Sequence, residues 1–138
     1  MRLGAAAAER LVAAARAARA RAYAPYSRYK VGAAVLTRRG AVYAGCNVEN
    51  ATYGATLCAE RSAIAAMVSA GDGDPLACAV VTAGPRPGAP CGICRQVLAE
   101  FAREMTVLLV AEDPQGRIVG RRSERLSRLL PQAFRLRH

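Results

Sequence analysis

The sequence lacks any apolar run that approaches the roughly 20 residues needed to span a bilayer. It also lacks a good secretory signal, because Glu9 and Arg10 interrupt the alanine stretch that follows Met1-Arg2-Leu3-Gly4. Such an interrupted stretch is a poor h-region for export. These absences predict a cytoplasmic protein with no membrane partner.

Internal repeats, low-complexity linkers and composition breaks that would mark a domain boundary are absent as well. Two domains would have only roughly 70 residues each and thin cores, whereas one domain of this size can bury roughly two-thirds of its unfolded surface. The hydrophobic content of 53% excludes a disordered tail. We therefore expect a single domain over residues 1–138.

Lysine is nearly absent, and this bears on the formal net charge of +10. Lys30 is the only lysine among 20 basic residues, and the arginines are spread along the chain with only short pairs such as Arg38-Arg39. A nucleic-acid site usually needs a stripe or a cluster of basic side chains. We interpret the charge as a compositional bias on a solvated surface and expect no nucleic-acid partner.

Helical and strand-like segments alternate along the chain. Periodicity and turn residues predict helices over residues 5–23, 57–70, 91–103 and 124–130, and strands over residues 31–37, 41–44, 77–83, 105–111 and 117–121. Thr56 is the expected N-cap of the second helix, and Gly71 is the residue expected to close it. This order predicts an α/β fold with a mixed sheet covered by helices.

Cysteine occurs in an odd number, which in a chain without an export signal argues against a disulfide framework. The five are Cys46, Cys58, Cys78, Cys91 and Cys94. The last two form a Cys-x-x-Cys pair, which is typical either of a redox site or of half a zinc site. A redox site would need a thioredoxin-like context, which the proline before the pair does not supply.

Two short motifs, Cys58-Ala59-Glu60 and Pro90-Cys91-Gly92-Ile93-Cys94, together follow the zinc-deaminase pattern. The first cysteine of each motif lies at the start of a predicted helix, where the positive helix end lowers thiol pKa values. Three thiolates leave one position of a tetrahedral zinc ion open for water, which is typical of a catalytic site. The alternative is a closed structural site with Cys46 or Cys78 as fourth ligand. Cys78 lies in an apolar strand, whereas spacing alone leaves Cys46 open.

Arg61 directly follows the glutamate of this pattern. Three thiolates and Zn²⁺ carry one net negative charge, which makes a bound water a weaker acid than it would be beside neutral histidines. An arginine that hydrogen-bonds a thiolate withdraws some of this electron density, so we expect Arg61 to tune the charge of the zinc site. The alternative is an arginine in a surface ion pair.

These motifs are part of a longer series of segments. In chain order the segments are Ala24-Pro25-Tyr26-Ser27, Val31-Gly32-Ala33-Ala34, Gly45-Cys46-Asn47-Val48-Glu49-Asn50-Ala51, Cys58-Ala59-Glu60-Arg61, Pro90-Cys91-Gly92-Ile93-Cys94-Arg95-Gln96, and Leu129-Leu130-Pro131 with Phe134. In this order they resemble the small cytidine deaminases of the all-cysteine type, roughly from residue 23 to residue 134. The resemblance implies a three-layer α-β-α fold with a mixed five-stranded sheet. It also implies one Zn²⁺ per chain and a homotetramer whose active sites are completed across subunits.

The resemblance further implies a role for individual residues. Cys58, Cys91 and Cys94 would hold the zinc ion. Glu60 would take a proton from water and deliver protons to N3 of the base and to the departing amine. The activity implied is hydrolytic deamination of cytidine and deoxycytidine to uridine and deoxyuridine with release of ammonia, as part of pyrimidine salvage.

A second group of residues would bind the small-molecule nucleoside. Asn47 and Glu49 resemble the ribose-binding pair, and the backbone N–H of Ala59 would bind the base. Tyr29 stands where the family usually has phenylalanine against the pyrimidine, and its added hydroxyl needs a partner or water. Phe134 resembles the aromatic residue that reaches a neighbouring subunit's pocket. From the residues alone, Asn47 and Glu49 also fit a turn at a strand end, and Phe134 also fits a core anchor for the last helix.

Two other functions fit parts of the same pattern. One is deamination of another aminopyrimidine nucleoside, such as blasticidin S. The other is a structural-zinc module that binds nucleic acid, which predicts salt-sensitive affinity without release of ammonia.

Overall fold

The computed structural model describes residues 3–136, so the opening Met1 and Arg2 lie outside the described residues. Its elements in chain order are α1 (Ala5–Arg19), β1 (Gly32–Thr37), β2 (Val42–Cys46), the short 3₁₀ helix η1 (Tyr53–Ala55), α2 (Ala59–Ser69), β3 (Pro75–Ala83), α3 (Gly92–Phe101), β4 (Thr106–Glu112), β5 (Ile118–Arg125) and α4 (Leu126–Leu129). The strands form a sheet in the order β2-β1-β3-β4-β5. β3 and β4 are parallel, and the other neighbours are antiparallel. The mixed five-stranded sheet is therefore confirmed.

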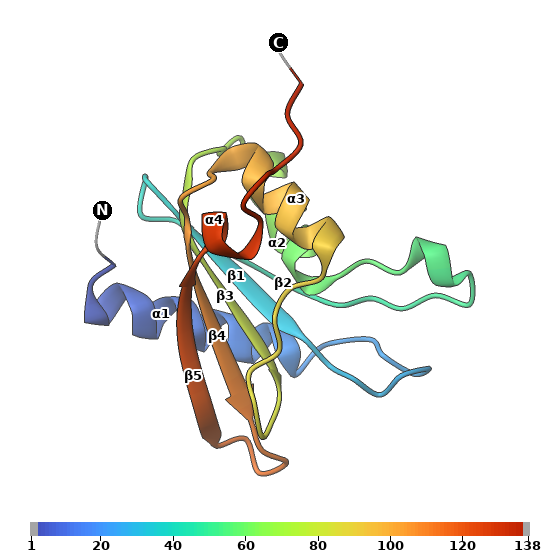
Figure 1. Cartoon of the computed structure of the whole chain (residues 1–138). Helices are drawn as coiled ribbons and strands as arrows, with labels where there is room; N and C mark the ends of the chain where they lie inside the picture. Colours follow the sequence, from blue (N-terminus) through green and yellow to red (C-terminus); the bar gives the residue numbers. More distant parts are fainter. Residues whose placement is uncertain (1–2, 137–138) are drawn as a thin grey trace.

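Helices cover both faces of this sheet (Figure 1). Ala34 and Leu36 of β1 belong to the cluster packed against α1, whereas Ala33 and Val35 belong to the cluster packed against α2 and α3. This alternation has the period of two expected of a strand that is buried on both faces. The three-layer α-β-α fold is confirmed as well.

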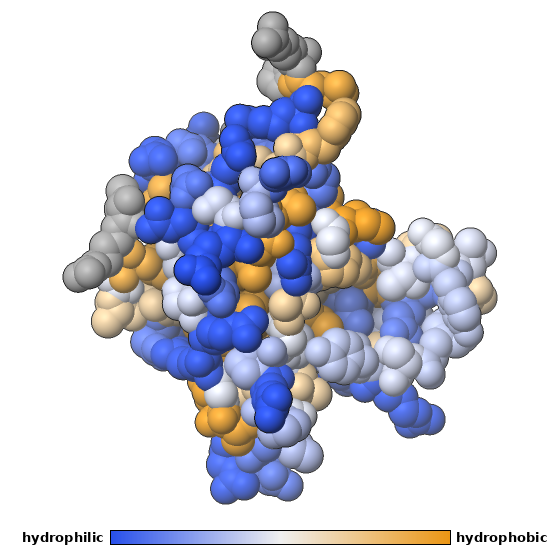
Figure 2. Space-filling model, viewed as in Figure 1, coloured by the Kyte–Doolittle hydropathy of each residue, from blue (hydrophilic) through white to orange (hydrophobic). Residues whose placement is uncertain are grey.

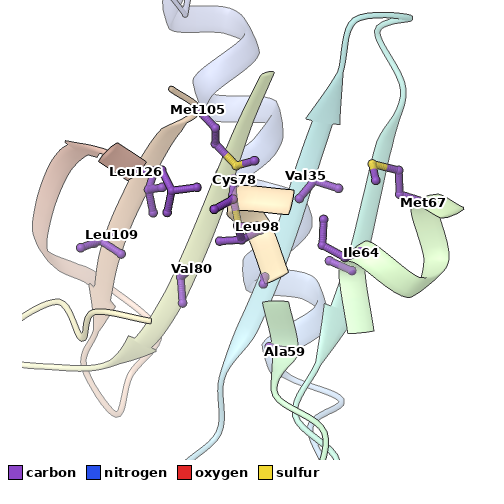
Figure 3. Close-up of a cluster of buried hydrophobic side chains, with 14 residues drawn as sticks. Val35, Ala59, Ile64, Met67, Cys78, Val80, Leu98, Met105, Leu109 and Leu126 are labelled. Carbon is purple, nitrogen blue, oxygen red and sulfur yellow. The ribbon is translucent and has the colours of Figure 1, made fainter. Parts of the chain in front are cut away.

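The larger hydrophobic cluster lies between the sheet and the layer formed by α2, α3 and α4. Figure 3 shows Cys78 of β3 beside Leu98 of α3, and Val35 of β1 beside Ile64 of α2. Burial of each large aliphatic side chain contributes about 1.5–3 kcal/mol. This packing fixes α2 and α3 against the same face of the sheet and places their N-terminal ends relative to each other.

α1 is shorter than the helix predicted over residues 5–23. It ends at Arg19, because the backbone after it pairs with a distant segment. The N–H of Tyr23 donates to the carbonyl of Asn47 at 3.0 Å, and Tyr23 forms a parallel bridge with Val48. The chain therefore leaves α1 and runs beside the segment that follows β2. These two projecting segments, residues 20–31 and 47–58, extend from the body of the molecule (Figure 1).

α2 begins later than predicted, at Ala59, and its N-cap is Cys58 rather than Thr56. Leu57 is held in an extended conformation, because it exchanges two backbone hydrogen bonds of 2.9 Å with Val48. The prediction of Thr56 as the cap is therefore wrong, because a non-local strand pairing overrides the local capping signal. As a consequence, Cys58 lies at the N-terminal end of the helix.

The C-terminal helix is also shorter than predicted. β5 extends from Ile118 to Arg125, beyond the predicted strand over residues 117–121, because its pairing with β4 continues to the pair Thr106 and Arg125. α4 is therefore limited to Leu126–Leu129. Hydrogen bonding along the neighbouring strand decides this boundary, and helix propensity does not.

At Gly32 the backbone of β1 lies directly against the backbone of α1. A Cβ atom at Gly32 would lie 2.0 Å from the carbonyl oxygen of Ala15 and 2.5 Å from the backbone nitrogen of Arg19. We expect Gly32→Ala to lower the free energy of unfolding by about 3 kcal/mol or more, because helix backbone cannot move aside as a flexible side chain can. Denaturant unfolding checks this. The matched control is Gly73→Ala, whose added Cβ would meet nothing within 4 Å; equal losses in the two variants would contradict the prediction.

The arginines are distributed over the surface, and many of them pair with acidic side chains. Figure 2 shows hydrophilic side chains spread over the visible face, with smaller hydrophobic patches between them. Ion pairs join Arg16 and Arg19 to Glu112, Arg38 to Asp74, Arg117 to Asp113, Arg121 to Glu9, Arg122 to Glu124 and Arg125 to Glu104. Within residues 3–136, the helices are too short or too polar to cross a membrane.

Candidate active site

Three cysteine side chains converge where α2 and α3 begin. Cys58 is the N-cap of α2, Cys91 is the N-cap of α3, and Cys94 lies in the first turn of α3. Their Sγ atoms all lie within 4.8 Å of one another, and those of Cys58 and Cys91 are 4.0 Å apart. The two motifs, more than 30 residues apart in the sequence, therefore form one cluster.

The donor set and its spacing fit zinc. Tetrahedral zinc with bonds of about 2.3 Å to sulfur places the sulfur atoms about 3.8 Å apart. The separation of 4.0 Å between the Sγ atoms of Cys58 and Cys91 is close to this value. Three thiolates fill three of the four tetrahedral positions and leave the fourth for a water molecule or a substrate atom.

The other two cysteines lie outside this cluster. Cys78 is fully buried in β3, and burial raises the pKa of its thiol. Cys46 ends β2, and within the described residues the cysteines that come together as a possible metal site are Cys58, Cys91 and Cys94. The geometry therefore favours an open three-cysteine site over a closed four-cysteine site.

The thiols of the cluster differ in their electrostatic surroundings. Partial burial opposes ionisation of Cys91, but hydrogen bonds from the Cys94 N–H and from neighbouring thiols hold its pKa below the ordinary value. Burial raises the pKa of Cys94, and the charges of Glu60, Cys58 and Cys91 raise it further. A divalent cation would offset this concentration of negative charge.

Glu60 is the second residue of α2 and is only 4% exposed. Burial raises the pKa of its carboxyl group, although its own backbone N–H and the charge of Arg61 partly oppose this effect. Glu60 follows Cys58 by two residues, so it lies in the first turn of the helix whose N-terminal end carries one thiol of the cluster. A buried carboxyl group whose neutral form is favoured can both accept and return a proton near neutral pH.

Arg61 points its guanidinium group toward the cluster rather than toward a surface carboxylate. Its Nη2 atom donates to Sγ of Cys58 at 3.4 Å and to the carbonyl oxygen of Thr56 at 3.1 Å. The hydrogen bond to Cys58 is the main reason that the pKa of Arg61 is raised. Its buried Nε atom has no hydrogen-bond partner within the described residues. This geometry favours a role at the thiols over the alternative of a surface ion pair.

Asn47 connects the end of β2 to the projecting segment that contains Tyr29. Its side-chain Oδ1 accepts from the N–H of Val31 at 2.9 Å, and its Nδ2 donates to the carbonyl of Tyr29 at 2.8 Å. The hydroxyl oxygen of Tyr29 lies against Gly88, where an added Cβ would be 2.8 Å away. Gly88 belongs to the loop that leads into Cys91, so the side chain of Tyr29 reaches from the projecting segment to that loop.

Glu49 binds the same projecting segment. Its carboxylate accepts from the backbone N–H groups of Tyr26 at 2.9 Å and Ser27 at 3.1 Å, and from the Ser27 hydroxyl. The hydrogen bond from Ser27 is the main cause that holds the pKa of Glu49 below its ordinary value. Glu49 and Ser27 also line a pocket of about 350 Å³ together with Tyr26 and Tyr53, whose rings meet edge to face at 6.0 Å.

Phe134 lies on the C-terminal segment, and the residue is 67% exposed. Its backbone is held by Gln96 of α3. The exposure of the ring disfavours the alternative in which Phe134 anchors the last helix in the core. Ala59, by contrast, is fully buried at the first position of α2. The N–H groups at such a position have no acceptor within the helix and are available to a ligand.

Three contributors to this arrangement were not predicted from the sequence: Ser27, which binds Glu49, Gln96, which holds Phe134, and the carbonyl of Thr56, which binds Arg61. Ser27 and Gln96 both stand inside segments that carry the family resemblance. Their presence in those segments could have indicated a role at the site. Neither residue, however, has a side chain that by itself suggests metal or acid–base chemistry. Their partners become apparent only in the folded chain.

Comparisons with known proteins match this geometry. The family model of the cytidine and deoxycytidylate deaminase zinc-binding region matches residues 6–110, which include the three clustered cysteines. The cytidine deaminase of Halalkalibacterium halodurans is 48% identical over 118 residues, which cover 85% of this chain and 86% of that protein. The cytidine deaminase of Mycobacterium tuberculosis strain H37Rv is 47% identical over 119 residues, covering 86% and 83% respectively.

Solved structures give the same result. The crystal structure of cytidine deaminase from Burkholderia pseudomallei matches with a TM-score of 0.81 at 47% identity, covering 91% of this chain and 98% of that chain. The crystal structure of cytidine deaminase from Mycobacterium tuberculosis matches with a TM-score of 0.76 at 45% identity, covering 93% and 97%. The similarity therefore extends over the sheet, its helices and the cysteine cluster.

Proposed function

The chain belongs to the family of cytidine and deoxycytidylate deaminases with a zinc-binding region, and we propose on this premise that it is a zinc-dependent cytidine deaminase. It converts cytidine and deoxycytidine to uridine and deoxyuridine with release of ammonia, in pyrimidine salvage. The observation that carries this proposal is the cluster of Cys58, Cys91 and Cys94 at two helix N-termini, with the buried Glu60 in the first turn of one of these helices. We further propose that residues 1–138 act as one deaminase domain.

Cys58, Cys91 and Cys94 would hold one Zn²⁺ per chain. Zinc supplies Lewis-acid chemistry that makes a water molecule a nucleophile near neutral pH. Glu60 takes a proton from the attacking water, whose oxygen bonds to C4 of the pyrimidine. It delivers this proton to N3, then takes the second proton from the hydroxyl group now bonded to C4 and passes it to the amine, and the bond between C4 and the amine nitrogen breaks with loss of ammonia. Burial raises the pKa of Glu60, which supports its ability to hold and return the proton.

Arg61 would tune the charge of this site. Its hydrogen bond to the thiol of Cys58 gives the sulfur a positively charged donor. Charge-assisted hydrogen bonds of this kind are roughly twice as strong as neutral ones. Arg61 therefore withdraws electron density from the ligand and offsets the net negative charge of three thiolates with Zn²⁺.

The nucleoside would be bound by side chains from both projecting segments. After its two backbone hydrogen bonds, the amide of Asn47 still has one N–H and one oxygen lone pair for a ribose hydroxyl. Glu49 is held as a carboxylate and can accept from a sugar hydroxyl. The N–H of Ala59 would bind the base, and Tyr29 would provide an aromatic face for the pyrimidine. Phe134 would contact a nucleoside bound to a neighbouring subunit.

We propose a homotetramer in the cytoplasm. Exposed large apolar side chains, among them Tyr53 and Ile93, supply area suited to contact between subunits. All five cysteines are free, and a site that depends on three thiolates is compatible with a reducing compartment. Sedimentation velocity of the purified protein tests the assembly state.

An ultraviolet assay of the purified protein with cytidine, deoxycytidine and blasticidin S tests the proposed function. We expect loss of the cytidine and deoxycytidine absorbance together with about one zinc per chain, the stoichiometry of a three-thiolate site. Deamination of blasticidin S alone would show that the substrate is a different aminopyrimidine nucleoside. Zinc without deamination, together with salt-sensitive binding to nucleic acid, would contradict the assignment as an enzyme.

A further inference from the structure

Gln96 holds the backbone of one residue with both ends of its side-chain amide. Its Nε2 donates to the carbonyl of Phe134 at 2.8 Å, and its Oε1 accepts from the N–H of Phe134 at 3.0 Å. Two opposed hydrogen bonds to the same residue fix both the position and the orientation of its backbone. The two residues are 38 positions apart in the sequence, so the contact joins distant parts of the chain.

The ring of Phe134 is exposed although its backbone is held. The preceding residues are anchored to the body, because Ala133 packs against the main hydrophobic cluster and Arg95 donates to the carbonyl of Leu129 at 2.7 Å. Arg95 and Gln96 are consecutive residues of α3, so this helix holds the C-terminal segment at two points, and Figure 1 shows the segment passing next to α3 after α4. A large apolar residue that is 67% exposed on a held backbone is suited to contact with another surface.

α3 also carries two cysteines of the candidate zinc site. Cys91 is its N-cap and Cys94 lies two positions before Gln96. The same rigid helix therefore sets both the position of these thiols and the position of the Phe134 backbone. A displacement of Phe134 relative to the cysteine cluster requires either bending of α3 or loss of the two hydrogen bonds of Gln96.

We propose that Gln96 is a positioning residue, which holds Phe134 in the orientation needed to contact a nucleoside bound to a second copy of this chain. This inference rests on the proposed function and on the contact of Phe134 across subunits. Gln96 itself would touch neither the nucleoside nor the metal. Its loss would leave the chemistry intact and would weaken substrate binding through Phe134.

Steady-state kinetics of Gln96→Met test this role, because methionine retains most of the side-chain volume but removes both hydrogen bonds. We expect KM for cytidine to rise about fivefold to tenfold, as two neutral hydrogen bonds of ordinary strength allow. We expect kcat to stay within about twofold and the zinc content to be unchanged, because no reacting group is altered. Gln96→Glu, which retains the acceptor but loses the donor, should give an intermediate KM. The matched control is Gln132→Met, an exposed glutamine of the same segment, which should behave as the wild type.

A double-mutant cycle connects the effect to Phe134. Phe134→Ala should raise KM at least as much as Gln96→Met, and the double variant should resemble Phe134→Ala alone. Co-expression of Glu60→Gln chains with Gln96→Met chains should restore a population of sites with the wild-type KM, because intact Phe134 rings would then reach sites that retain Glu60. Additive effects, no low-KM population, or loss of zinc in Gln96→Met would overturn the inference. A wild-type protein that does not deaminate cytidine would instead contradict the proposed function.

Discussion

Replacement of Glu60 by glutamine is expected to lower kcat for cytidine about ten-thousandfold, the upper range for loss of a general acid–base group. Glutamine has nearly the same volume as glutamate and can form hydrogen bonds, but it cannot accept a proton from water or return one to the substrate. KM should change little, because the carboxylate acts on the proton and contributes less to ground-state binding.

The surroundings of Glu60 explain why no neighbouring group should replace it. Its carboxylate is buried at the start of α2, and Arg61, the residue that follows it, directs its guanidinium toward Cys58. Arginine stays protonated in proteins and cannot act as a base at neutral pH. Cys91 and Cys94 belong to the same cluster as Cys58, and their thiolates would be occupied as zinc ligands.

Single-turnover kinetics, zinc analysis and thermal unfolding of the same Glu60→Gln sample check this prediction. The zinc content should stay at about one per chain and the thermal midpoint should not fall, because removal of a buried charge relieves its desolvation cost. Glu104→Gln is the matched control, since Glu104 is an exposed glutamate whose partners are Arg125 and Ser127 at the surface. If Glu60→Gln retained more than about one-hundredth of the wild-type kcat, the role of Glu60 as the proton carrier would be wrong.

Residues whose signal is local could be predicted from the sequence. The Cys-x-x-Cys pair lies on the first turn of α3, where three-residue spacing brings both side chains to one face of the helix end. The burial of every residue of β1 likewise follows from a short apolar run that is covered on both faces. In both cases the arrangement of the side chains follows from neighbouring residues in the sequence, and contacts with distant segments do not alter it.

Residues whose position depends on non-local pairing could not be predicted. Leu57 is extended because it pairs with Val48, and this pairing moved the start of α2 away from Thr56. The hydrogen bonds of Ser27 to Glu49 and of Gln96 to Phe134 join residues 22 and 38 positions apart. No periodicity encodes such contacts. The sequence motifs therefore predict the chemical groups of the site, whereas the supporting contacts required the folded structure.

Replacement of Cys94 by alanine is expected to remove zinc and activity together. Cys94 is fully buried and lies within the group of Sγ atoms that come within 4.8 Å of one another. With two thiolates left, the site loses one of the three protein ligands that a catalytic zinc centre requires. We expect the zinc content to fall from about one per chain to near zero after dialysis against a chelator, and activity to fall below about 1% of wild type, since metal binding needs the complete ligand set.

Cys78→Ala is the matched control, because it removes another fully buried thiol from the same face of the fold. Its side chain packs in the hydrophobic cluster outside the cysteine site, so its loss should cost about 1 kcal/mol of stability and leave zinc and turnover in place. Cys46→Ala separates the remaining alternative, in which Cys46 closes the site as a fourth ligand. Zinc retained in Cys94→Ala but lost in Cys46→Ala would contradict the three-cysteine site. Zinc lost in Cys94→Ala but retained in Cys46→Ala would show that zinc binding and turnover depend on the thiols at the starts of α2 and α3.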